Sequence, residues 1–418
     1  MLKKFIIQIS IKFLAVLCGV FTTRWQISNF STTELANYTL ILSYNSIILM
    51  ATAWGLPQIT QKFFTNYSKS DGNKDDNRDS NKILANYWST SVFLRVLSYF
   101  VGLILIFVTY PLSQTNDLLA IIQIFTAQWI LVADLVFKSI ADSNGTSWKF
   151  SITDLLGKLL IIIGVYLFGN NLFSFLGNNI YSFATLSIVA YIISLLVDSL
   201  WQKQHYNWGK IDFSLLKTEL GAIGFLTMAD LINGLYSKTD VIFLKVFGFG
   251  NVDVISYANA YKLFDIATIV PSLAMPILAT VLRKKLNNQE ITKKNLIKFY
   301  GLSLVAGLLL CVVINILAGV GVWLIDPEGK YLDSIYFLRI LSLVLIVLFP
   351  TLLSSDLLNV SGLENQQFWS KLATCVLAII LYMVCIPIFG VTGSAIATVI
   401  YFGFEAICKG WFVYKYVK

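Results

Sequence analysis

The chain has 418 residues, of which 57% are hydrophobic and only 13% charged, and its mean hydropathy is +0.72. Soluble domains carry about 25% charged residues, so this composition excludes an ordinary soluble fold and predicts an integral membrane protein. The net charge of +8 lies in short polar gaps between apolar runs and forms no basic face, which argues against a nucleic-acid partner.

Twelve segments are long and apolar enough to cross a membrane, which takes ~20 mostly apolar residues. Lys12 interrupts the first segment and many segments follow it, so we expect a transmembrane helix there and no removable signal peptide. An all-α, polytopic membrane protein is therefore the predicted fold class. In chain order the segments cover approximately 5–28, 34–60, 83–110, 117–140, 148–168, 179–202, 216–245, 253–282, 296–325, 332–358, 368–388 and 391–414.

The Lys and Arg residues in the gaps predict the orientation of the chain. If the N-terminus is cytoplasmic, the inside gaps hold 22 of these residues, with Lys409 near the C-terminus among them. The outside gaps hold only Lys245 and Lys330. Because cytoplasmic loops of membrane proteins are enriched in Lys and Arg, both termini are predicted to face the cytoplasm.

A spacing shared by two segments indicates an internal repeat. Tyr38 precedes Pro57 by nineteen residues in the second segment, and Tyr257 precedes Pro276 by nineteen in the eighth. Six segments in each half would give both halves the same orientation, so the repeat would be parallel. The two predicted lobes are residues 1–208 and 209–418.

The sequence offers little for catalysis or for a cofactor. His205 is the only histidine, no Ser-His-Asp arrangement can be assembled around it, and no phosphate-binding loop of the Walker type occurs. The five cysteines lie within apolar segments without a Cys-x-x-Cys pair and are interpreted as packing residues. We therefore expect no enzyme activity, no cofactor and no metal site.

Four cations lie deep in the predicted segments without an obvious partner in the sequence: Arg24, Arg95, Lys262 and Arg339. A charge at the middle of a bilayer costs at least ~2.5 kcal/mol, so such residues face the protein interior or a watery cavity. Cations lining a shared cavity would suit an anionic substrate, and Arg suits phosphate best because its planar fork donates two bonds at once.

Other intramembrane charges have structural explanations. Asp154 and Lys158 are four residues apart on one helix and are expected to neutralise each other. Lys238, Asp356 and Glu405 lie close enough to segment ends for their polar heads to reach the membrane surface.

Two prolines in the eighth segment, Pro271 and Pro276, are candidates for a hinge. Each proline removes a backbone hydrogen bond and can kink its helix. A bending point for a moving lobe and a static kink filled by neighbours are both compatible with this pattern.

The seventh and eighth segments, Tyr236 to Leu278, resemble the polysaccharide transporters that flip lipid-linked oligosaccharides. Those proteins belong to the multidrug/oligosaccharidyl-lipid/polysaccharide exporter superfamily. Their pattern is an Asp at the end of one helix, a short loop, and a Tyr-x-x-Ala-x-Lys start to the next helix with Pro further along. The matching residues here are Asp240, Tyr257, Ala260, Lys262, Pro271 and Pro276.

Further features of the chain resemble the same family. Arg24 followed by the Gly55-Leu56-Pro57 exit of the second segment resembles the family's opening helix pair. The stretch from Phe389 to Thr398 resembles its helix opening rich in small residues, which permit close packing. One departure is Ser31-Thr32-Thr33-Glu34, which stands where the family usually has a turn that contains Gly.

The resemblance implies a flippase for undecaprenyl-pyrophosphate-linked repeat units of O-antigen (part of lipopolysaccharide) or of a similar surface polysaccharide. In that family two six-helix lobes enclose a central cationic cavity that opens alternately to either side of the bacterial inner membrane. Carried onto this chain, Arg24 and Lys262 would contact the pyrophosphate or an anionic sugar, with Arg95 and Arg339 added from their depth alone. Asp240 and Asp265 are candidates for ion coupling.

The implied partners are the lipid-linked oligosaccharide, membrane lipids, H⁺ or Na⁺ as coupling ion, and other proteins of polysaccharide assembly. One alternative is a multidrug or cation antiporter of the same superfamily, whose cavity should be dominated by acidic residues. A second alternative is a membrane-embedded polysaccharide polymerase or ligase, but the short outside gaps leave little room for the catalytic loop that such an enzyme needs.

Overall fold

The computed structural model describes residues 2–57, 60, 64, 74–143, 147–168, 179–202, 208–214, 220–287 and 293–416. Over these residues every regular element is a helix and there is no strand, so the predicted all-α class is confirmed. Each of the twelve predicted segments coincides with one helix or with two consecutive helices.

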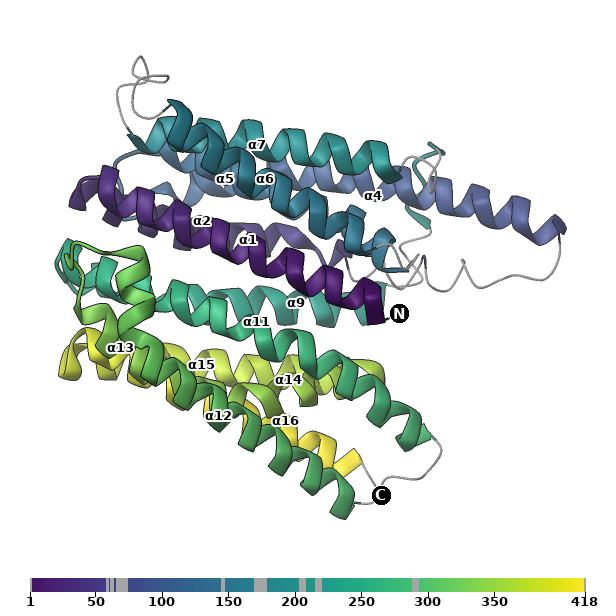
Figure 1. Ribbon diagram of the computed structural model, residues 1–418. Coiled ribbons are helices and arrows are strands. Elements are labelled where there is room, and N and C mark those ends of the chain that lie inside the picture. Colours follow the sequence, from purple (N-terminus) through teal and green to yellow (C-terminus); the bar gives the residue numbers. More distant parts are fainter. Residues whose placement is uncertain are drawn as a thin grey trace. The chain divides into compact units, whose positions relative to one another are not determined.

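The first compact unit comprises Met1–Thr227 and is a bundle of long helices (Figure 1). In this bundle α5 occupies a central position, because it contacts α2, α4, α6 and α7. α1 packs along α6, and α6 packs along α7. The helices are α1 (Leu2–Asn29), α2 (Thr32–Ala53), α4 (Lys74–Thr109), α5 (Leu118–Ser143), α6 (Ser147–Phe168) and α7 (Asn179–Gln202), and the short 3₁₀ helix η1 (Tyr110–Leu112) follows α4.

The second compact unit comprises Met228–Lys418, and the division falls inside α9. The closest pairs here are α15 with α16, α14 with α16, α11 with α13, and α12 with α14. Two lobes are therefore present, whereas the predicted boundary at residue 208 stays a prediction. The helices are α9 (Leu220–Lys238), α10 (Asp240–Val246), α11 (Asn251–Asn287), α12 (Lys293–Ile325), α13 (Asp333–Ser342), α14 (Val344–Val360), α15 (Glu364–Phe389) and α16 (Val391–Tyr416).

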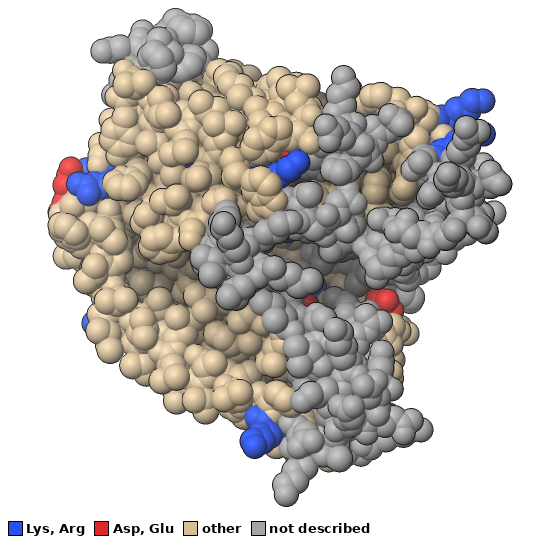
Figure 2. Space-filling view, turned by 45° about the vertical axis from the view of Figure 1, so that its right-hand side comes forward, with Lys and Arg blue, Asp and Glu red and all other residues tan. Residues whose placement is uncertain are grey.

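Length and hydropathy identify the helices that can cross a membrane. Among the described residues eight helices qualify singly, and α13 with α14 qualifies as a pair bent by 41°. Large apolar side chains such as Phe100, Ile104 and Phe107 on α4, and Leu309 and Ile316 on α12, are exposed. Figure 2 shows few charged side chains over the described part of the surface in that view. Such a surface suits lipid rather than water.

The segment that departs from the family pattern forms a helix start of another kind. The Ser31 hydroxyl accepts a hydrogen bond from the backbone N–H of Glu34, and the Ser31 N–H donates to the Glu34 carboxylate at 2.8 Å. This reciprocal capping box satisfies two N–H groups at the start of α2. The Ser-Thr-Thr-Glu sequence thus begins the second helix without the glycine of the family pattern.

The small residues that open α16 allow a close helix approach. Gly393 lies against the backbone near the end of α15, and a Cβ atom there would lie 2.5 Å from the carbonyl carbon of Cys385 and still closer to its oxygen. Backbone atoms cannot move aside as a flexible side chain can. Gly393 therefore determines how closely α15 and α16 pack, and these two helices share the largest contact in the second unit.

We expect Gly393→Ala to lower the apparent melting temperature of the purified protein by several degrees, because overpacking of this kind costs about 1–3 kcal/mol. Gly403→Ala on the same helix is the matched control, since beyond its own stretch of helix no described atom lies within 4 Å of its Cβ position. Alanine is favoured over glycine in a helix by ~1 kcal/mol, so the control should be neutral or slightly stabilising. Equal melting temperatures for the two variants would contradict the close approach. Thermal unfolding in detergent measures both.

Candidate functional site

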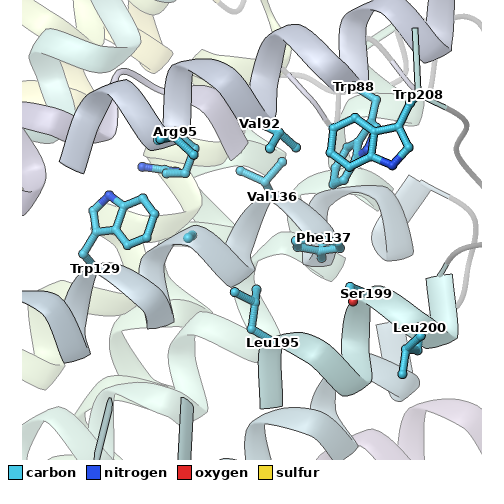
Figure 3. A pocket seen from close by; sticks show the side chains of 12 residues that line it. Trp88, Val92, Arg95, Trp129, Val136, Phe137, Leu195, Ser199, Leu200 and Trp208 are labelled. Atoms are coloured by element: carbon cyan, nitrogen blue, oxygen red, sulfur yellow. The ribbon is translucent and has the colours of Figure 1, made fainter. Parts of the chain in front are cut away.

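The first unit contains a cavity of about 500 Å³ between α4, α5 and α7. Arg95 is the one ionisable residue among the described residues of its wall, and apart from Ser199 the rest of that wall is apolar or aromatic (Figure 3). The lining residues include three tryptophans from different parts of the chain: Trp88, Trp129 and Trp208.

Arg95 is 4% exposed, and its Nε and Nη2 atoms have no hydrogen-bond partner among the described residues. Ser98, one turn further along α4, donates its hydroxyl to the Arg95 carbonyl at 2.7 Å and accepts a hydrogen bond from the Trp129 indole at 3.2 Å. Trp129 is thereby held beside the turn of α4 that carries Arg95. The cation is buried, and no described residue forms an ion pair with it.

The segment at residues 208–214 runs along the start of α4 through three hydrogen bonds. The backbone N–H groups of Gly209, Lys210 and Asp212 each donate at 2.8 Å to a side chain of α4, which are Ser89, Asn86 and Thr90 in that order. Two hydrogen bonds from Ser214 lower the pKa of the exposed Asp212 carboxyl below its usual range. The segment places Trp208 against the cavity and near Trp88, with ring centroids 6.5 Å apart.

A second cavity of about 240 Å³ in the same unit is lined by charged residues, including Lys12, Asp134 and Asp154. Lys158 pairs with Asp154 at 3.0 Å, which confirms the predicted neutralisation within α6. Asp134 on α5 is buried and lies close to the buried Asp198 on α7.

In the second unit, α11 carries a line of polar residues beside the end of α9. Lys238 on α9 pairs with the exposed Asp265 at 3.4 Å, and its Nζ atom lies 4.8 Å from the ring centroid of Tyr261. Lys262, also on α11, is half-buried. Pro271 and Pro276 both lie within the continuous helix α11, so the hinge stays a prediction.

Asp240 at the start of α10 is 2% exposed and fully engaged. Its carboxylate accepts hydrogen bonds from the Tyr257 hydroxyl and from the backbone N–H of Val241, both at 2.8 Å. Two residues of the family-like pattern, Asp240 and Tyr257, are thus in direct contact and join α10 to α11.

Glu405 forms a buried ion pair with Lys409 one turn along α16, so the prediction that Glu405 reaches the membrane surface is wrong. Each residue is 2% exposed. The Tyr236 hydroxyl donates to Glu405 at 3.1 Å, and Lys409 donates to the Ser355 hydroxyl at 2.8 Å. Lys371 on α15 is also buried, and its positive charge attracts the Glu405 carboxylate. Lys409 therefore does not belong among the 22 Lys and Arg residues that the orientation prediction assigns to the cytoplasmic gaps.

The four predicted cavity cations differ in burial, but all four lack an ion pair among the described residues. Arg24 on α1 and Lys262 on α11 are half-buried, Arg95 on α4 is buried, and Arg339 on α13 is exposed. Within the described part of the chain none of them forms an ion pair, whereas Lys158, Lys238 and Lys409 all do. The described residues contain no group of three or more His, Cys, Asp or Glu side chains that could hold a metal ion.

Comparison with known proteins gives a result at the level of the fold. No family model and no curated protein matches the chain. Solved structures match over nearly the whole length. An inward-facing multidrug resistance MATE family transporter of the MOP superfamily is 14% identical, with a TM-score of 0.74 over 99% of this chain and 98% of the other.

An outward-facing structure of a multidrug resistance MATE family transporter gives a TM-score of 0.67 at 16% identity, over 99% of this chain and 94% of the other. The chain has the MATE transporter fold. A MOP superfamily transporter from Pyrococcus furiosus, described as having a binding pocket of reverse polarity that suggests a different function, gives the same TM-score at 15% identity. It covers 99% of this chain and 94% of the other.

We expect Lys409→Met to destabilise the protein strongly, because breaking a buried ion pair leaves an uncompensated charge at a cost of about 3–5 kcal/mol. The double variant Glu405→Gln with Lys409→Met should recover much of the loss, since neither charge then remains. Lys415→Met, an exposed position on the same helix, is the control for loss of a positive charge. Melting temperatures in detergent measure the effect, and additive losses in the double variant would show that the two charges are not coupled.

Proposed function

We propose that the chain is a flippase that moves undecaprenyl-pyrophosphate-linked oligosaccharide repeat units, of O-antigen or a similar surface polysaccharide, from the cytoplasmic to the outer leaflet. The observation that carries this proposal is the set of four cations on the helices of a transporter fold that have no ion-pair partner among the described residues. In a low-dielectric site a cation without a partner is costly unless an anion arrives from outside the protein.

Arg24 and Lys262 are the proposed contacts for the pyrophosphate or an anionic sugar. They stand where the family-like pattern has its cations, one in each lobe, and both are half-buried rather than sealed in the core. Arg95 and Arg339 complete the proposed cationic set from their depth. The solved structure with reversed pocket polarity supports the view that, within this fold, polarity varies with function.

Alternating access across the bacterial inner membrane is the proposed mechanism, with both termini cytoplasmic and with α11 bending at Pro271 and Pro276. An H⁺ or Na⁺ gradient, or the membrane potential, would drive it. Asp240 and Asp265 are proposed coupling residues, and the two neighbouring buried carboxyl groups of Asp134 and Asp198 are a further candidate. Membrane lipids and other polysaccharide-assembly proteins are the proposed partners. The solved structures with this fold are transporters, which favours a role without catalysis.

Deletion of the gene should abolish surface polysaccharide and cause lipid-linked repeat units to accumulate on the cytoplasmic side. Arg24→Gln and Lys262→Gln should each reduce export at least tenfold while membrane expression stays normal, because each removes a charge that the substrate phosphate would contact. Lys330→Gln is the control, since Lys330 is in a loop where it pairs with Glu328 at 2.8 Å. Normal export in both test variants would remove the site assignment. Unchanged polysaccharide in a deletion strain that lacks a redundant flippase would refute the function.

A multidrug or cation antiporter is the second candidate, and the observation that favours it is a pair of aspartates in the second cavity of the first unit. Asp134 and Asp154 line this cavity, and the buried Asp198 neighbours Asp134. Carboxylates could hold a cationic substrate or exchange it for protons. The two lysines of the same wall, Lys12 and Lys138, weaken that attraction.

The two candidates predict opposite results with a cationic dye. A flippase for an anionic lipid should leave dye retention in energised cells unchanged, and Asp134→Asn should then have no effect on it. An antiporter should extrude the dye, and Asp134→Asn should slow extrusion several-fold. Fluorescence of cells loaded with the dye measures both. Extrusion that depends on Asp134 would replace the flippase proposal with the antiporter.

A further inference from the structure

The cavity around Arg95 combines one buried cation with a wall that, apart from Ser199, is apolar or aromatic. Val92 on α4, Val136 on α5, and Leu195 and Leu200 on α7 are among its apolar lining residues (Figure 3). Val96 on α4 is another. Its volume of about 500 Å³ lies within the ~300–1,000 Å³ typical of small-molecule sites. The cavity therefore offers a ligand one charged group, the Arg95 guanidinium, and a largely apolar wall.

The group that would compensate the charge of Arg95 is an anion. Two of the three guanidinium nitrogens of Arg95 have no partner among the described residues, and no carboxylate is among the residues that line the cavity. Burial of a charge without compensation costs several kcal/mol. Phosphate oxygens match the planar fork of the guanidinium and can accept two bonds at once.

The apolar part of the site continues onto exposed apolar side chains, a surface that suits lipid in a membrane-spanning chain. Val96 on α4 and Leu200 on α7, which both line the cavity, are strongly exposed, as are their neighbours Leu97 and Leu196. An apolar chain could therefore leave the cavity between α4 and α7 without entering water. Trp88, Phe137 and Trp208 close another part of the wall with aromatic rings.

We propose that this cavity binds a lipid phosphate, with the phosphate on Arg95 and the hydrocarbon chain along the apolar walls of α4 and α7. The site lies within the first lobe and needs no residue of the second. For Arg95 it rests on the proposed function, in which this residue belongs to the cationic set, and it names the cavity where this residue would meet a phosphate. Trp208 makes the segment at residues 208–214 part of the site.

Quenching of tryptophan fluorescence by brominated lipids tests the proposal, because three tryptophans line the cavity. The full chain in detergent is titrated with dibrominated phosphatidylglycerol, which is anionic, and with dibrominated phosphatidylcholine, which is zwitterionic. We expect phosphatidylglycerol to quench at concentrations at least fivefold lower. Arg95→Gln should abolish this preference and Arg95→Lys should retain part of it, while Lys330→Gln, a charge-matched control in a loop, should leave it unchanged.

Trp129→Phe should reduce the amplitude of the selective quenching, which locates the lipid beside Arg95. Undecaprenyl phosphate should relieve the quenching as a second lipid phosphate, whereas the same concentration of inorganic phosphate should not. Equal quenching by both brominated lipids, a preference that survives Arg95→Gln in folded protein, or full relief by inorganic phosphate alone would overturn the proposal. Because the assay measures binding to purified protein, its result does not depend on whether the chain exports oligosaccharides.

Discussion

The cost of placing a charge in a low-dielectric environment constrains this structure more than any single contact. Each intramembrane charge costs at least ~2.5 kcal/mol unless a partner compensates it. Asp154 with Lys158, and Glu405 with Lys409, meet the cost within one helix turn. Arg95 does not meet it from the described residues. These pairs neutralise charges inside the protein, whereas a buried charge without a partner among the described residues is a candidate for binding a ligand.

The second lobe shows how packing supports such compensation. Gly393 brings the start of α16 close to the end of α15, and further along α16 the Glu405–Lys409 pair reaches Tyr236 on α9 and Ser355 on α14. One helix therefore combines a steric contact near one end with an electrostatic network toward the other. Since a buried pair contributes little net stability, the network's effect is to fix which helices neighbour α16.

Features set by neighbouring residues could be predicted from the sequence. Hydrophobic length located all twelve segments, and the spacing of Asp154 and Lys158 predicted their pair. The same spacing relates Glu405 to Lys409, but their distance from the predicted segment end favoured the wrong interpretation, because depth along a helix does not reveal which face is covered. The surroundings of Arg95 depend on Trp129 and Trp208, which are distant in sequence, so only the fold could bring them together.

Substrate choice follows from polarity rather than from the fold. Identities of 14–16% to transporters of this fold establish the arrangement of helices and nothing about the cargo. Within the described residues, the paired lysines are unavailable to a substrate, whereas the cations without ion-pair partners are available to an anion. A cationic drug would be repelled by the positive charge at each of those positions. Under the proposed function, the cations that lack ion-pair partners among the described residues are the reason to expect an anionic rather than a cationic substrate for this chain.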